Sequence, residues 1–167
     1  MDKLFLVYLG GSAPKANIEV HDIQFVVAEK IEDTYPQLIG DWFGDVKGLH
    51  LDSYKEIKGA DGYKVEVKDH PQENNDNLYF VNLGGYQQDK LNELHEFGLF
   101  VADSAAKAKK KALNSLLKNS SQRHKDNLME VDDCLQISSV NGKYIHLEES
   151  DESYDLQPDW FGYRVIG

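Results

Sequence analysis

The chain contains one sequence pattern twice. Residues 4–11 (LFLVYLGG) return as residues 78–85 (LYFVNLGG). At the same separation, residues 19–22 (EVHD) return as residues 93–96 (ELHE). A repeat of this kind indicates one structural unit that is present twice, and it constrains the architecture more strongly than any local pattern does. We therefore expect two units that fold alike.

Each unit shows the pattern of two strands, a helix and two further strands. Runs of β-forming residues predict the strands, and apolar residues at helical spacing predict the helices. The turn pairs Asp61-Gly62 and Asn141-Gly142 favour tight hairpins, because a type I′ turn needs positive φ at both central positions. The expected strands are residues 4–9, 20–28, 49–58 and 63–67 in the first unit and 78–83, 94–101, 131–138 and 143–147 in the second.

The helices are less uniform than the strands. In the first unit, Ile31, Tyr35, Leu38 and Trp42 form one apolar stripe. Pro36 falls in the first helical turn if Asp33 is the N-cap, and it must kink the helix if the helix begins earlier. In the second unit, a helix is predicted over residues 104–117 with Asp103 as its N-cap, followed by a loop over residues 118–127.

These elements predict an α+β protein made of two tandem ββαββ repeats that pack with pseudo-two-fold symmetry. Each half of the 167-residue chain alone would have a small core, so the two units should bury apolar surface against each other. The expected boundaries are residues 1–69 for repeat unit one, 70–77 for a polar linker, and 78–167 for repeat unit two.

The chain is acidic, with a formal net charge of -11 spread over both halves. Such a surface repels phosphate groups, so we expect neither nucleic acid nor an anionic membrane as a partner. The single cysteine, Cys134, cannot form an intrachain disulfide, and no apolar stretch approaches the length of a signal peptide core or a membrane span. The sequence thus predicts a soluble cytoplasmic protein, and free strand edges would allow a homodimer.

Several segments resemble one bacterial family. They are LGG at residues 9–11, NIEVHD at 17–22, IEDT at 31–34, WFG at 42–44, HLDS at 50–53 and PDWFGYR at 158–164. The chain resembles a two-copy member of the domain-of-unknown-function family 1543, a resemblance that implies no activity because the family has none assigned. In the second unit, Asp22 is replaced by Glu96 and Asn17 by Leu91. The strand order is also similar to that of β-grasp folds, although the Gly-Gly pairs lie inside the chain and imply no conjugation.

The repeated Glu-x-His motif is the strongest candidate for a functional site. On a strand, Glu19 and His21 point to the same face, as do Glu93 and His95. A carboxylate beside a histidine suits ligand binding or acid–base chemistry, but a histidine at a strand entry can equally be structural. The candidate ligand-binding residues are Gly10, Gly11, Asn17, Glu19, His21, Asp22, Gly84, Gly85, Glu93, His95 and Glu96.

Other patterns give weaker indications. His50-Leu51-Asp52 and His146-Leu147-Glu148 each place a histidine and a carboxylate on one strand face, but they do not correspond between the units. Zinc needs three or four ligands, and one cysteine with scattered histidines is a poor set, so no metal and no cofactor are predicted.

We therefore expect a module that binds an unidentified small molecule or protein near the Gly-Gly loops and the Glu-x-His strands. The alternative is an enzyme that uses the Glu/His pairs for acid–base catalysis.

Overall fold

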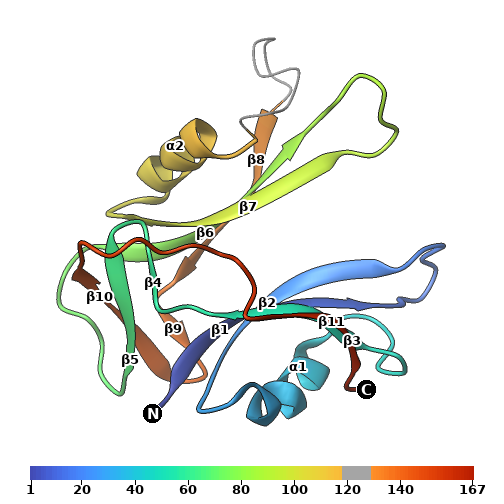
Figure 1. Cartoon of the computed structure of the whole chain (residues 1–167), viewed down its shortest axis with the longest axis horizontal. Helices are drawn as coiled ribbons and strands as arrows, with labels where there is room; N and C mark the ends of the chain where they lie inside the picture. Colours follow the sequence, from blue (N-terminus) through green and yellow to red (C-terminus); the bar gives the residue numbers. More distant parts are fainter. Residues whose placement is uncertain (118–128) are drawn as a thin grey trace.

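The computed structural model describes residues 1–117 and 129–167. The α+β prediction is confirmed: these residues form mostly strands, with two α-helices (Figure 1). In order, the elements are β1 Lys3–Gly11, β2 Val20–Ala28, the 3-10 helix Ile31–Thr34, α1 Tyr35–Asp41, β3 His50–Glu56, β4 Gly59–Ala60, β5 Tyr63–Lys68, β6 Asn77–Gly85, β7 Leu94–Ala102, α2 Ala105–Ser115, β8 Met129–Ile137, β9 Ser139–Val140, β10 Lys143–Glu149 and β11 Trp160–Val165.

Within the described part of the chain, the strands form three sheets. The first sheet has the order β11-β3-β1-β2, and the second sheet has the order β7-β6-β8. The joint sheet, β4-β5-β10-β9, takes strands from both halves of the chain, because β5 pairs antiparallel with β10. The last hairpin strand of each unit therefore pairs across the molecule instead of completing its own sheet.

The two central hairpins have the same register. Gly10 lies opposite His21 in the β1–β2 pair, and Gly84 lies opposite His95 in the β6–β7 pair. β3 in the first sheet and β8 in the second sheet also carry a bulge at the same place, beside Tyr8 and Leu9 of β1 and beside Asn82 and Leu83 of β6. The repeat seen in the sequence is thus a repeat of backbone pairing.

Apolar residues form three clusters because the central strands alternate between two buried faces. Phe5, Val7 and Leu9 of β1 face α1, whereas Leu4 and Leu6 face a shared interior. That interior also contains Phe80 and other residues of the second unit, and a third cluster lies between the second sheet and α2. The two helices lie on opposite outer sides of the molecule, with the sheets between them (Figure 1).

Several local expectations need adjustment. The first strands do not stop before the Gly-Gly pairs: β1 and β6 include both glycines and end at Gly11 and Gly85, two residues later than expected. Both helices begin after a different N-cap, Thr34 and Ser104, and Pro36 lies in the first turn of α1, where its missing N–H is harmless. The loop predicted over residues 118–127 lies outside the described residues. The two hairpin turns do have positive φ at both central positions: Asp61, Gly62, Asn141 and Gly142.

The C-terminal strand β11 is held against β3 by a carboxylate. Asp159 accepts hydrogen bonds from the backbone N–H of Glu56 at 2.7 Å and from the Lys55 ammonium at 3.0 Å. Burial alone would raise the pKa of Asp159, but these two donors outweigh it and hold the pKa below its ordinary value. The ionised carboxylate therefore stabilises the fold above the ordinary carboxyl pKa, and this contribution is lost as the pH falls through the lowered pKa.

Asp159→Asn is expected to lower the free energy of unfolding at pH 7 by about 1 kcal/mol, since Asp159 is partly exposed to solvent. The difference from wild type should shrink as the pH falls below about 4. Urea unfolding of both proteins at several pH values measures this, with the exposed Asp151→Asn as the control. A difference that stays constant with pH would show that the charge of Asp159 contributes nothing.

Candidate functional site

The candidate site lies at the end of the first sheet, on the face that turns toward the second unit. Along β1, Leu4 and Leu6 belong to the shared interior, and Tyr8 stacks on Phe97 of β7 with ring centroids 6.3 Å apart. Because side chains alternate along a strand, Gly10 is the next residue on this face. The β1–β2 and β6–β7 hairpins extend beyond it toward the same side of the molecule (Figure 1).

Four side chains converge above Gly10, and we call them the Gly10 cluster: Glu19, His21, His50 and Asp52. His21 Nε2 lies 3.0 Å from Glu19 Oε1 and 3.2 Å from Asp52 Oδ2. His50 Nε2 lies 3.4 Å from the same Glu19 oxygen and 3.3 Å from Asp52 Oδ1. Two carboxylates are thus held between two imidazole rings.

The absence of a side chain at Gly10 makes room for this cluster. A Cβ atom built there would lie 2.6 Å from His50 Nε2 and 3.0 Å from both carboxylates. A Cβ atom on Gly11 would instead meet the indole of Trp42, 3.1 Å away, on the α1 face. Neither glycine has a positive φ, so close approach on both faces is the reason for this Gly-Gly pair.

His50 is the most buried member of the cluster, with 2% of its side chain exposed. Its Nδ1 lies 2.9 Å from the carbonyl oxygen of Gly48, which can only accept, so Nδ1 carries the hydrogen. Its Nε2 is buried and makes no hydrogen bond. Tyr163 of β11 packs on the ring at 4.1 Å between centroids and covers it from the other side.

Asp52 owes its direction to the bulge in β3. Tyr8 pairs with Ser53 and Leu9 pairs with Leu51, so Asp52 is the extra residue between them. A bulge breaks the strict alternation of a strand and can re-aim one side chain. Here it leaves the Asp52 carboxylate beside both histidines. Tyr8 lies nearby, and burial together with the charges of Asp52 and Asp22 raises the pKa of its hydroxyl.

The structure separates the other candidate residues of the first unit from this cluster. Asn17 is exposed in the β1–β2 loop, and Asp22 is exposed with its carboxylate accepting the backbone N–H of Ile23 at 2.8 Å. Of the first-unit candidates, the structure therefore brings Glu19 and His21 together above Gly10, whereas Gly11 faces Trp42 on the opposite side of β1. His50 and Asp52 complete the Gly10 cluster, although the sequence alone singled them out only weakly.

The second unit repeats part of the arrangement. His95 Nε2 lies 3.6 Å from Glu93 Oε2, and His95 is opposite Gly84 as His21 is opposite Gly10. Glu96, however, accepts a hydrogen bond from the backbone N–H of Leu117, beyond the end of α2. The register places Glu130 opposite Gly84, where the first unit has His50. Gly85 lies at the end of β6 opposite Leu94, as Gly11 lies opposite Val20.

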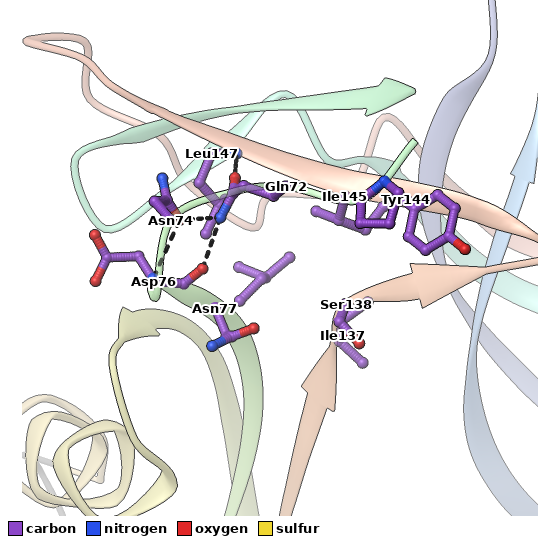
Figure 2. A pocket seen from close by; sticks show the side chains of 11 residues that line it. Gln72, Asn74, Asp76, Asn77, Ile137, Ser138, Tyr144, Ile145 and Leu147 are labelled. Atoms are coloured by element: carbon purple, nitrogen blue, oxygen red, sulfur yellow. Dashed lines mark hydrogen bonds between the residues drawn. The ribbon is translucent and has the colours of Figure 1, made fainter. Parts of the chain in front are cut away.

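Two of the cavities that the described residues form lie elsewhere in the molecule. One of about 250 Å³ lies between the joint sheet and the segment that connects β5 to β6, where Gln72 bonds this segment to Leu147 of β10 (Figure 2). Its polar lining groups include Gln72 and the carbonyl of Asp76, which bond each other at 2.8 Å. The other, of about 910 Å³, lies beside β5 and Tyr154. No residue of the Gly10 cluster lines either cavity.

Two further polar residues have structural surroundings. The His146 imidazole contacts the carbonyl oxygen of His70 at 2.7 Å and so fixes the linker to β10. Cys134 packs against the cluster under α2, and burial raises the pKa of its thiol, with a small opposing effect from Lys109. A thiol with a raised pKa is a poor nucleophile at neutral pH.

Comparisons with known proteins identify the family. The model of the family described as Domain of Unknown Function (DUF1543) matches residues 16–67 and 90–139, more than half of the chain. The chain belongs to this family, and the two matched segments confirm that it is a two-copy member. It is also similar to the crystal structure of a protein Il1583 from Idiomarina loihiensis, at 40% sequence identity and a TM-score of 0.80, over 100% of this chain and 99% of that one. A comparison with curated proteins gives no match.

Within the described residues, no helix is long and apolar enough to cross a membrane.

Proposed function

We propose that this protein is a small-ligand-binding module and that its binding site is the Gly10 cluster. One observation carries the proposal: four ionisable side chains from separate strands and loops converge on one point, and the buried Nε2 of His50 has no hydrogen-bond partner there. Buried polar groups in proteins are nearly always paired, and an exception often marks a ligand site. A small ligand that pairs this nitrogen and lies between the two carboxylates would satisfy all four groups.

The proposal places the site on a duplicated scaffold. The equal registers of β1–β2 and β6–β7 support two ββαββ repeats with pseudo-two-fold symmetry, bounded at residues 1–69 and 78–167. Both Glu-x-His motifs then face the space between the two hairpins. Location in the cytoplasm, homodimer formation and the lack of nucleic-acid or membrane partners stay predictions from composition and strand edges.

A thermal-shift screen of metabolites and metal salts tests the proposal. Wild type should show a ligand-dependent rise in melting temperature, because a ligand that binds only the folded state stabilises it. Glu19→Gln should lose that rise, since it removes the shared carboxylate without changing the side chain's shape. Asp22→Asn should keep the rise, because Asp22 directly follows His21 in β2 but lies outside the cluster.

Two results would contradict the proposal. In the first, no compound raises the melting temperature of the wild type. In the second, a compound raises the melting temperatures of wild type and Glu19→Gln equally, which would place binding elsewhere. The unliganded melting temperatures of the variants must stay near that of wild type for either comparison to count.

An enzyme is the second candidate. The observation that favours it is the position of His21, whose side chain is 38% exposed while its Nε2 contacts two carboxylates. A solvent-accessible imidazole paired in this way can transfer protons. Turnover of a compound from the screen that is abolished in His21→Ala and retained in Asp22→Asn would support this function. Binding without turnover supports the module alone.

A further inference from the structure

We infer that the Gly10 cluster binds a divalent transition-metal cation of the zinc class. This inference rests on the proposed function and names its ligand. The ligand atoms of Glu19, His50 and Asp52 lie within 4.8 Å of one another, close enough to hold one ion. His21 lies against the same two carboxylates, with its Nε2 3.0 Å from Glu19 and 3.2 Å from Asp52.

The spacing around His50 Nε2 fits a coordination shell better than it fits hydrogen bonds, whereas His21 Nε2 lies within hydrogen-bond distance of Glu19 at 3.0 Å. Zinc binds nitrogen and oxygen ligands at about 2.0–2.1 Å, so neighbouring ligand atoms of a tetrahedral site lie about 3.3–3.4 Å apart. His50 Nε2 lies 3.3 Å from Asp52 Oδ1 and 3.4 Å from Glu19 Oε1. A charge-assisted hydrogen bond would be shorter, at about 2.7–2.9 Å.

The orientation of the His50 ring leads to the same conclusion. Its Nδ1 faces the carbonyl oxygen of Gly48, so Nε2 is directed into the cluster. This buried nitrogen makes no hydrogen bond, and a cation held between it and the two carboxylate oxygens would pair all three atoms. A carbonyl that fixes one ring nitrogen while the other binds metal is the usual outer-shell arrangement of a histidine ligand.

The mixture of ligands selects the class of cation. Imidazole nitrogen with carboxylate oxygen suits zinc, cobalt and nickel, whereas calcium and magnesium prefer oxygen ligands alone. The second unit has Glu130, not histidine, opposite the glycine of its hairpin. We therefore assign the cation to the first unit, and the second unit supplies matched control positions.

Isothermal titration of zinc chloride into the full-length chain, with no affinity tag, tests the inference. Wild type should bind one zinc ion tightly at the Gly10 cluster. Glu19→Gln and Asp52→Asn should each weaken binding at least tenfold, because each removes one anionic ligand. Glu93→Gln, the equivalent change in the second unit, should stay within twofold of wild type, and so should Asp22→Asn.

Cobalt provides a second readout that does not depend on affinity. Co²⁺ in a tetrahedral nitrogen and oxygen site absorbs visible light strongly, so its spectrum reports the geometry of the shell. The band should form with wild type, vanish on adding excess zinc, and be lost in His50→Gln. If that buried variant does not fold, Asp52→Asn, with a partly exposed side chain, serves in its place.

The results that overturn the inference differ from those that overturn the proposed function. If zinc and cobalt do not bind while another compound binds wild type and not Glu19→Gln, the cation is wrong and the module stands. If nothing binds, both the inference and the proposed function are wrong. Zinc that binds every variant equally would be held by surface carboxylates and would also overturn the inference.

Discussion

Phe80→Ala is expected to destabilise both units together, by about 3–5 kcal/mol, the usual cost of removing a buried aromatic side chain. Phe80 is 4% exposed and lies in the shared interior. Its ring packs edge-on against Phe25 of the first unit, with centroids 5.8 Å apart, and against Phe97 of the second at 5.2 Å. The cavity left by the ring would lie in the interior that both units share. We therefore expect one cooperative unfolding transition, with its midpoint at a lower denaturant concentration than that of wild type. Circular dichroism and tryptophan fluorescence measure it, because Trp42 and Trp160 both belong to the cluster under α1.

Phe161→Ala is the matched control. Phe161 is 77% exposed on β11, so the same chemical change should alter stability by less than about 0.5 kcal/mol. Phe80→Leu keeps most of the buried volume and should fall between the two, which provides a folded variant if the alanine protein is too unstable to study. Two separate transitions, with fluorescence from the first unit unchanged, would show that the units fold independently and share no core.

The central hairpins could be predicted from sequence because their signals are local. The apolar run of β1, the second strand from Val20 to Ala28, and the repeated turn pairs all act within a few residues of one another. Because the pattern is repeated, the same prediction applied to both units. The predicted strand ends at Leu9 and Leu83 were two residues too early, because the Gly-Gly pairs belong to the strands. In β1, the two glycines make room for side chains on both faces.

The pairing between distant segments could not be predicted in the same way. β5 carries an alternating pattern that fits any neighbouring strand, so nothing in it specifies β10 as the partner. β11 lies more than 100 residues from β3, and the exposed Phe161 and Tyr163 hid its role as an edge strand of the first sheet. Such contacts depend on the packing of the whole chain, so no periodic pattern in the sequence predicts them.

Only part of the candidate site could be predicted from the sequence, because the repeat marks some of its residues and not others. The duplication drew attention to Glu19 and His21, but it gave no support to His50 and Asp52, because the second unit has no histidine at the corresponding register position. Asp52 also depends on a bulge, and a bulge changes the direction of a side chain without a clear sequence signal. The prediction of no metal assumed scattered histidines, whereas the structure brings the ligand atoms of Glu19, His50 and Asp52 within 4.8 Å of one another.

Gly10→Ala is expected to abolish zinc binding and to lower the free energy of unfolding by about 1–3 kcal/mol, the usual cost of overpacking. The added methyl group would lie 2.6 Å from His50 Nε2 and 3.0 Å from the two carboxylate oxygens, so it occupies the floor of the site. His50 cannot move away freely, because Tyr163 packs on its ring and Gly48 holds its Nδ1. Zinc titration and urea unfolding of the same preparation measure the two effects.

Gly11→Ala separates loss of the site from general strain. Its methyl group would meet Trp42 at 3.1 Å on the opposite face of β1, so this variant should lose stability while it keeps the zinc affinity of wild type. Gly40→Ala places a methyl group in open space on α1 and should change neither quantity for the worse. If Gly10→Ala binds zinc as wild type does, the cluster above Gly10 is not the cation site. If Gly11→Ala loses binding to the same extent, the loss reports strain in the strand, since Gly11 does not face the cluster.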